Sequence, residues 1–313
     1  MSDKIFHNLN ASIKPKGFAD ILKWKLSSKQ PKWPKLVPLA TSDVPPVRVE
    51  GDEIRVSFVG HVSFLIQTKS LNILTDPVWS LRTSPFSFAG PKRVTPPGIK
   101  FEDLPKIDIV LISHNHYDHL DIATVKKLWL RDRPHIITPL MNDKVLQANI
   151  AGIEVTTLNW SEKVSITDDI EIALEPAQHW SARGLFDRNI ALWGTFLINL
   201  PKGTICFIGD TGYSKEVFET IGNKYENILL SLIPMGAFEP RWFMQDVHIN
   251  PEEAVLIHQH LNSKYSIGSH FETFQLADDA YDQARSELEA ARIKYKISPD
   301  TFIVPNIGGA YKF

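Results

Sequence analysis

The sequence predicts an α/β protein in which two β-sheets lie between layers of helices. Three observations support this fold class. Short runs rich in Ile, Val and Leu, which suit buried strands, come early in each half of the chain. Segments with apolar residues at helical spacing follow them, and turn-forming residues separate the elements. With 313 residues, the chain can bury a large core without disulfide support.

Residues 1–50 are expected to form an extended N-terminal arm that packs on a single domain formed by residues 51–313. Pro and Lys are frequent between residues 29 and 47, and they favour extended backbone at the surface. A short amphipathic helix around residues 18–24 precedes this stretch. The alternative is that the arm works as a lid or touches a membrane.

Regular structure is expected from residue 54 onward. A Pro-, Ser- and Gly-rich connection at residues 77–106 is long enough to favour a functional loop. The expected strands lie at residues 54–61, 63–68, 71–77, 107–112, 135–138, 153–158, 164–179, 191–200, 203–213, 227–235, 265–269 and 301–306. Helices are expected after the capping residue Asp121 and at residues 142–150, 251–261 and 275–291.

The composition restricts the class of function. The net charge of −2 and the pI near 6.6 argue against general affinity for nucleic acid. The one cysteine, Cys206, excludes an internal disulfide and fits a reducing compartment. The N-terminus lacks the apolar core of a signal peptide, and no apolar run is long enough to span a bilayer. We therefore expect a cytoplasmic protein, with peripheral membrane contact as an option; a homodimer is compatible with the sequence.

A dense group of polar residues follows the apolar strand at residues 107–112. His114, His116, Asp118 and His119 occur within six residues. A solvated polar loop at a strand end is common for one histidine and rare at this density. Imidazole with a few carboxylates suits zinc and, less selectively, iron or manganese. This stretch therefore predicts a metal site.

Three more donors each stand where an apolar β run stops, and such positions collect ligands in sheet-based sites. They are His179, Asp210 and His270. Seven donors suit two metal ions that share a carboxylate, with a hydroxide between them as the nucleophile. The expected assignment gives one ion His114, His116 and His179, and gives the other Asp118, His119 and His270, with Asp210 shared between them.

The motif HxHxDH with these downstream donors resembles that of the metallo-β-lactamase superfamily. Longer segments resemble the N-acyl-phosphatidylethanolamine-hydrolysing phospholipase D group, among them LTDPVWSLRTSPFSFAGPKRV, PAQHWSARGLFD and GAFEPRWFM. The resemblance implies a four-layer αββα sandwich, a two-zinc site, and cleavage that releases an N-acylethanolamine and phosphatidic acid. One departure is Glu272, which replaces a small residue beside the last donor and brings a charge there.

Several other residues are candidates for roles at this site. Asp76 is expected to hydrogen-bond a ligand histidine, or else to cap the turn before Pro77. Asp118 would orient the hydroxide and carry its proton, and His248 would contact the phosphate or protonate the leaving oxygen, unless it is a cap or surface histidine. The residues expected to bind substrate are Trp180, Glu239, Arg241 and Trp242, with Phe186 and Phe238 as further groove candidates. The remaining histidines, for which a structural or exposed position is expected, are His7, His61, His135, His258 and His260.

The function predicted from these observations is a zinc-dependent phosphodiesterase that hydrolyses N-acyl-phosphatidylethanolamine or a related glycerophosphodiester. One alternative is a metal-dependent lactonase acting on a sugar-phosphate lactone, which the long SPFSFAGPKR match disfavours. A second is a non-catalytic metal- or lipid-binding module. Such modules usually lack a ligand, and none of the seven is missing here.

Overall fold

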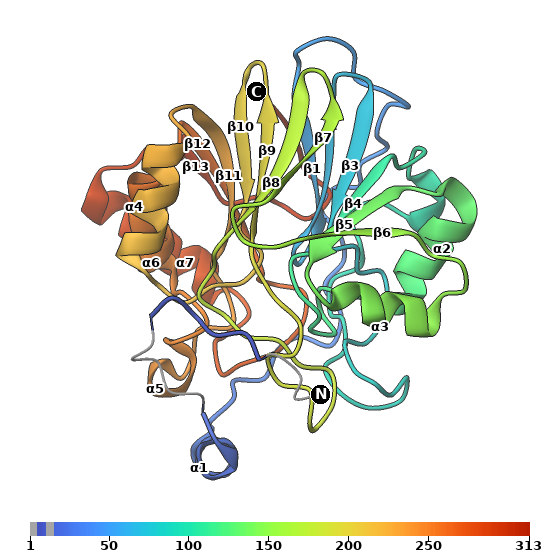
Figure 1. The fold of residues 1–313 in the computed structure, drawn as a ribbon. Helices are drawn as coiled ribbons and strands as arrows, with labels where there is room; N and C mark the ends of the chain where they lie inside the picture. Colours follow the sequence, from blue (N-terminus) through green and yellow to red (C-terminus); the bar gives the residue numbers. More distant parts are fainter. Residues whose placement is uncertain (1–4, 11–15) are drawn as a thin grey trace.

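The computed structural model describes residues 5–10 and 16–313, and it consists of two seven-stranded sheets packed face to face. Figure 1 shows helices α2 and α3 outside the first sheet and helices α4, α6 and α7 outside the second. The expected αββα sandwich is therefore confirmed.

The first sheet has the strand order β14-β1-β2-β3-β4-β5-β6. Strands β14 to β3 pair in antiparallel fashion, and β3 to β6 pair in parallel fashion. Its strands are β1 (Arg55–Gly60), β2 (Ser63–Thr68), β3 (Leu71–Thr75), β4 (Ile109–Leu111), β5 (His135–Pro139), β6 (Val155–Leu158) and β14 (Ala310–Lys312).

The second sheet has the order β13-β12-β11-β10-β9-β8-β7. Here β13 to β10 are parallel, and β10 to β7 are antiparallel. Its strands are β7 (Lys163–Thr167), β8 (Ile170–Glu175), β9 (Thr195–Leu200), β10 (Gly203–Phe207), β11 (Ile228–Pro234), β12 (Tyr265–Ser269) and β13 (Phe302–Ile303).

Two of the helices that pack on the sheets begin at residues with clear capping chemistry. Asp121 accepts hydrogen bonds from the backbone of Ala123 and Thr124 at the start of α2, and Asn250 forms a reciprocal capping box with Glu253 at the start of α6. The helices are α1 (Phe18–Ser27), η1 (Phe101–Asp103), α2 (Ile122–Asp132), α3 (Asn142–Asn149), α4 (Lys215–Lys224), α5 (Arg241–Met244), α6 (Pro251–His260) and α7 (Gln283–Tyr295).

Successive side chains of a strand point to opposite faces of the sheet, so one strand can contribute to two apolar cores. In β2, Phe64 and Ile66 contribute to the apolar core between the sheets, whereas Leu65 contributes to a second core beneath α2. Leu128 of α2 packs in this second core. The central strands β2 to β5 are therefore covered on both faces, which accounts for their mostly apolar sequences.

The helix expected from residue 275 begins at residue 283 instead. Residues 276–279 are used to bind the N-terminal arm: Trp24 Nε1 donates to Asp278 Oδ2 at 3.0 Å, and Trp33 Nε1 donates to the Asp279 carbonyl at 2.8 Å. Leu276 and Ala277 pack with Trp24 in a small separate core. These tertiary contacts override the helical pattern of residues 275–282.

The described part of residues 1–50 contains α1 and otherwise runs without regular structure along the domain. The Trp24 ring stacks on Phe243 with 4.8 Å between the ring centroids. Further along the arm, the Asp43 N–H donates to the Gly98 carbonyl at 2.9 Å. Among the described residues, no helix is long and apolar enough to cross a membrane.

Candidate metal centre

The candidate donors gather at the end of the sandwich where several strands of both sheets stop. His114, His116, Asp118 and His119 lie in the turn between β4 and α2. The other three donors follow three strands of the second sheet, namely His179 after β8, Asp210 after β10 and His270 after β12. The structure brings all seven together, because β8, β10 and β12 run in the same direction and end at one edge of the second sheet, next to the turn that follows β4.

Among the described residues, four groups of His and Asp side chains have ligand atoms within 4.8 Å of one another. Two of these groups hold six of the seven donors, one of them together with His61. We call His114, His116 and His179 the histidine set, and Asp118, His119 and His270 the Asp118 set. In the histidine set, His116 Nδ1 lies 2.9 Å from His114 Nε2 and 3.2 Å from His179 Nε2. These two sets hold the residues that the sequence assigns to the two ions, and that assignment of ions stays a prediction.

Asp210 lies between the two sets. Its Oδ2 atom is 3.1 Å from His119 Nε2 and 3.7 Å from His179 Nε2, and its Oδ1 atom is 3.3 Å from His270 Nε2. One carboxylate therefore faces donors of both sets, as a shared ligand must.

The separations fit a metal ion. Around a tetrahedral zinc ion with bonds of about 2.0–2.1 Å, neighbouring ligand atoms lie about 3.3 Å apart. In the Asp118 set, Asp118 Oδ2 is 3.4 Å from His119 Nε2 and 3.3 Å from His270 Nε2. Both of these nitrogens are buried and have no hydrogen-bond partner in the described part of the chain, which is costly unless a ligand satisfies them.

The charges at the site also favour bound cations. Burial acts to raise the pKa of the Asp210 carboxyl, but His119 and His270 hold it well below its usual value. Burial acts to lower the pKa of His270, yet Asp210 and Asp118 raise it to about 9. Without metal ions, the two buried carboxylates thus retain protons on neighbouring imidazoles. Positive charge is required here, and metal ions are able to provide it.

Hydrogen bonds outside the cluster fix two of the imidazoles. His119 Nδ1 donates to Asp76 Oδ2 at 2.6 Å, and the same carboxylate accepts from the Ser113 N–H and hydroxyl. His179 Nδ1 donates to the Val247 carbonyl at 2.9 Å. In both residues Nε2 is left to face the cluster. Asp76 therefore lies where the sequence placed it, against a candidate ligand.

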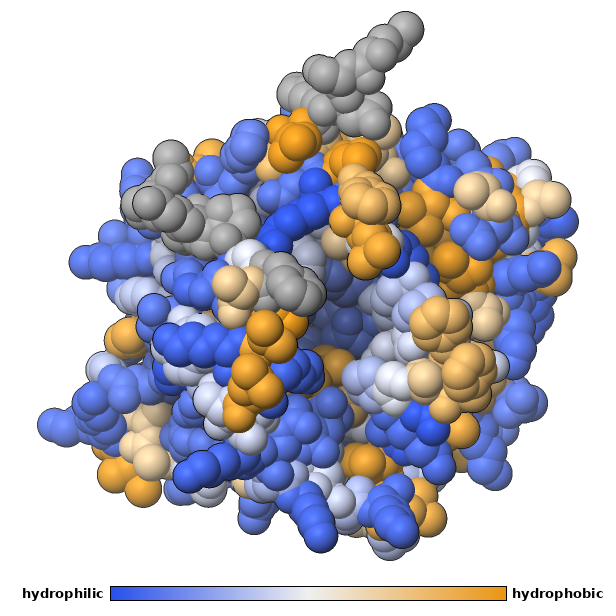
Figure 2. All heavy atoms as spheres, turned by 90° about the horizontal axis from the view of Figure 1, so that it is seen from below, coloured by the Kyte–Doolittle hydropathy of each residue, from blue (hydrophilic) through white to orange (hydrophobic). Residues whose placement is uncertain are grey.

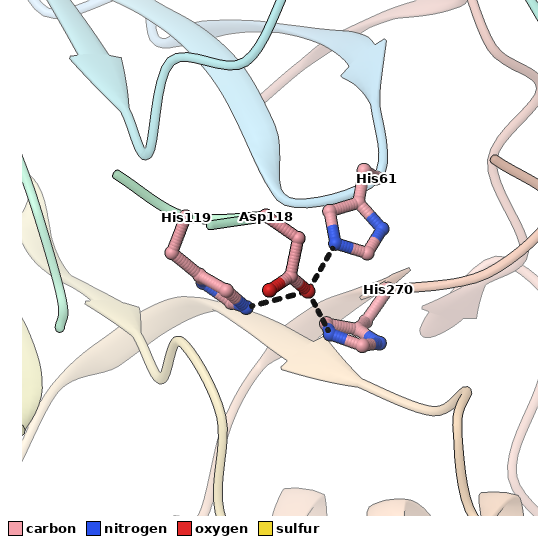
Figure 3. Close-up of side chains that lie close together, drawn as sticks. All are labelled: His61, Asp118, His119 and His270. Atoms are coloured by element: carbon pink, nitrogen blue, oxygen red, sulfur yellow. Dashed lines mark hydrogen bonds and ion pairs between the residues drawn. The ribbon is translucent and has the colours of Figure 1, made fainter. Parts of the chain in front are cut away.

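His61 also lies in the cluster, although a structural or exposed position was expected for it from the sequence. It follows β1, is fully buried, and directs Nε2 to within 2.9 Å of Asp118 Oδ2 (Figure 3). Burial and the neighbouring His270 lower its pKa to about 3, so it is neutral and its single N–H is on Nε2. The available signal was its position at a strand end, which His179 and His270 share.

His248 lies at the rim of the cluster, with Nδ1 3.8 Å from Asp210 Oδ2 and a side chain 15% exposed. Burial lowers its pKa to about 4. Its backbone carbonyl accepts a hydrogen bond from Arg241 Nη1 at 2.9 Å. Arg241 thus supports the loop that carries His248.

The other expected substrate residues differ in their distance from the cluster. Trp180 is close, because its ring centroid is 4.4 Å from that of His116. Arg241 forms its ion pair with Glu253 at 2.8 Å, whereas Glu239 accepts from the backbone N–H of Arg241. Trp242 is partly exposed on α5.

The remaining expectations concern Glu272 and the groove aromatics. The carboxylate of Glu272 makes two hydrogen bonds of 2.9 Å to Arg285, which balances its charge beside His270. Phe238 is fully buried in the core, whereas Phe186 is almost fully exposed.

Comparison with known proteins identifies the family. The beta-lactamase superfamily domain matches residues 71–271, and the chain belongs to this superfamily. A relative from Caenorhabditis elegans, N-acyl-phosphatidylethanolamine-hydrolyzing phospholipase D 1, is 37% identical over 262 residues, which cover 80% of this chain and 74% of the relative. The mitochondrial N-acyl-phosphatidylethanolamine-hydrolyzing phospholipase D of Saccharomyces cerevisiae is 35% identical over 70% of this chain and 47% of its own length.

Solved structures agree on the fold. Igni18, a metallo hydrolase from Ignicoccus hospitalis, has a TM-score of 0.61 at 21% sequence identity and covers 83% of this chain and 98% of its own. Together with the donor cluster and the family match, the relatives establish the chain as a metal-dependent hydrolase.

Proposed function

We propose that the protein is a zinc-dependent phosphodiesterase that hydrolyses N-acyl-phosphatidylethanolamine or a related glycerophosphodiester. The observation that carries this proposal is the position of Asp210 between two sets of donors, which suits a pair of metal ions. The substrate class is supported by the 37% identity to a relative named for this activity. The histidine-rich donor set favours zinc, with iron or manganese as the other ions that it suits.

In this proposal the histidine set holds one ion and the Asp118 set holds the other, with Asp210 contacting both. When bound, the ions would supply a strong nucleophile near neutral pH and Lewis-acid stabilisation of the phosphoryl oxygens. His119 and His179 are already oriented for this task by Asp76 and by the Val247 carbonyl.

Asp118 and His248 are the residues that we propose to handle protons. Water attacks phosphorus, the bond from phosphorus to the ethanolamine oxygen breaks, and phosphatidic acid and an N-acylethanolamine are released. Asp118 orients the attacking water and accepts its proton. Burial lowers the pKa of His248 in the free protein, and the anionic phosphate beside its ring would raise it again. His248, at the rim of the cluster, can then donate a hydrogen bond to the phosphate or a proton to the leaving oxygen. Trp180 borders the same space beside His116.

A lipid substrate also requires contact with a membrane or micelle. The loops after β3 and β8, together with α1 and α5, lie at the lower end of the molecule in Figure 1. They carry exposed apolar residues, among them Leu26, Phe88, Leu185 and Phe186, the last 94% exposed. Figure 2 shows hydrophobic side chains around a hollow on this face. We propose that this face meets the lipid surface.

Incubation of the purified, zinc-loaded protein with N-acyl-phosphatidylethanolamine tests the proposal. The expected products are N-acylethanolamine and phosphatidic acid in equal amounts, measured by mass spectrometry, with two zinc ions per chain by metal analysis. Chelator-treated protein serves as the control, and activity should return when zinc is added. Turnover of a lactone or a carboxylic ester without any diester cleavage contradicts the proposed substrate class.

A further inference from the structure

The side chain of Asn8 binds both backbone polar groups of His179. Asn8 Nδ2 donates to the His179 carbonyl at 2.9 Å, and the His179 N–H donates to Asn8 Oδ1 at 3.0 Å. The two residues are 171 positions apart in the sequence. Since His179 Nδ1 is also bound by the Val247 carbonyl, the main chain and the ring of this histidine are both held in place.

The same arm is attached to the two loops that flank His179. The Phe6 N–H donates to the Asn189 carbonyl at 2.9 Å, and Arg188 Nη1 donates to the Lys16 carbonyl at 3.0 Å. Lys16 Nζ lies 3.0 Å from Asp246 Oδ2, although both side chains are 28% exposed and this ion pair contributes little stability. The arm thus connects the loop after β8 to the loop before α6.

These contacts border a partly open cavity of about 90 Å³, of which His179 forms part of the wall. Asn8, Lys16 and Ile21 of the arm line one side of it, and His179, Trp180 and Phe243 line the other. A cavity of about 150 Å³ holds a benzene molecule, so this space suits a group of only a few carbon atoms. His179 belongs to both the cavity wall and the histidine set, and the Trp180 ring of the same wall packs against His116, so the cavity borders the metal centre.

We propose that the N-terminal arm forms a specificity subsite of the enzyme, in which Asn8 positions His179 and the cavity accepts a short apolar group attached to the substrate phosphate. The subsite rests on the proposed phosphodiesterase function for its substrate, whereas the positioning of His179 depends only on the metal centre. The occupant is inferred from the walls that the cavity shares with that centre, His179 and Trp180, and from the apolar side chains of Ile21 and Phe243 that also line the space.

The positioning role of Asn8 is tested through metal affinity, which does not require the substrate to be known. Replacing Asn8→Ala removes both hydrogen bonds to His179, and we expect zinc affinity to fall roughly 10-fold or more in competition with a chromogenic chelator. Asn8→Asp keeps the acceptor oxygen, so its zinc affinity should lie between those of the wild type and Asn8→Ala. His7→Ala, an exposed neighbour, is the matched control. Wild-type zinc affinity in Asn8→Ala overturns the positioning role.

The subsite is tested with methyl and butyl p-nitrophenyl phosphate on the zinc-loaded protein. We expect kcat/KM to be roughly tenfold higher for the butyl diester, because the added methylenes are buried. Ile21→Trp fills the cavity and should bring this ratio close to one. Leu22→Trp, on the same helix but outside the cavity lining, should keep the wild-type ratio. Equal rates for both diesters in the wild type, or an unchanged ratio in Ile21→Trp, overturn the subsite.

If neither diester is cleaved, the phosphodiesterase proposal fails without deciding the subsite. Calorimetry with butylphosphonic and methylphosphonic acid then decides it. The same roughly tenfold preference for the butyl compound is expected, and it should be lost in Ile21→Trp. Equal affinity for both acids in the wild type overturns the subsite.

Discussion

His61 Nε2 lies 2.9 Å from Asp118 Oδ2, the same carboxylate oxygen that faces His119 and His270 (Figure 3). A hydrogen bond to this oxygen holds the carboxylate in the orientation that a bound ion needs. We therefore expect His61→Ala to lower zinc affinity by roughly 10- to 100-fold, measured by chelator competition. His61→Gln can place an amide N–H where Nε2 stood and should recover part of the loss. An alanine variant that binds zinc like the wild type contradicts this role.

We predict that metal binding by both donor sets depends on Asp210. Because its two oxygens face His119, His179 and His270, Asp210→Ala should reduce the zinc content from two ions per chain to one or fewer. Hydrolysis should fall by roughly 10³-fold or more, as is typical when residues that act as a unit are disrupted. The exposed acid Asp169, which faces Lys69, gives a control in Asp169→Ala. Retention of both ions in Asp210→Ala would exclude a shared ligand.

A histidine remote from the metal centre predicts the acid sensitivity of the fold. His258 of α6 is buried, its Nδ1 lies 2.8 Å from Ser266 Oγ, and burial lowers its pKa from 6.5 to about 4. Between these values the unfolded chain binds a proton that the folded chain does not, so stability falls as the pH drops from 6.5 towards 4.

The variant His258→Gln removes this proton linkage. Between pH 7 and pH 5, the free energy of unfolding of the wild type should therefore fall by about 1–2 kcal/mol more than that of His258→Gln, as measured by urea unfolding. A difference between the two proteins that is constant over this pH range would show that His258 does not cause the loss.

The apolar loop tip after β8 predicts lipid binding. Leu185 and Phe186 are 91% and 94% exposed, and burying them in a bilayer is favourable. The double variant Leu185→Asp, Phe186→Asp should bind vesicles of N-acyl-phosphatidylethanolamine and phosphatidylcholine roughly tenfold more weakly in a sedimentation assay. Ile293→Asp, a change of a residue on α7 that is 71% exposed, is the control. Equal binding by both variants would locate the lipid contact elsewhere.

The fold and the gathering of the seven candidate donors in one place could be predicted because their signals are local in sequence. Apolar strands and the residues that follow them occupy consecutive positions, and the HNHYDH turn concentrates four donors in one place. Parallel strands then bring His179, Asp210 and His270 to the same edge, which is a property of the sheet rather than of any one residue.

The parts that could not be predicted depend on contacts between distant residues. The only local signal for His61 is its position at a strand end, and its partner Asp118 is 57 positions away in the sequence. The sequence around Asn8 gives no indication that its side chain contacts His179. Likewise, residues 275–282 carry a helical pattern, but the contacts with Trp24 and Trp33 prevail. Such choices are decided by packing, which single-sequence patterns do not contain.

The two sheets contribute unequally to the donor cluster, and this has a mechanical consequence. His114 and His116 follow a strand of the first sheet, whereas His179 follows a strand of the second. An ion held by these three residues would link the two sheets of the sandwich to each other at that end. Its removal should loosen the molecule first at that end, and faster amide hydrogen exchange in the donor loops than in the opposite hairpins would record the loosening.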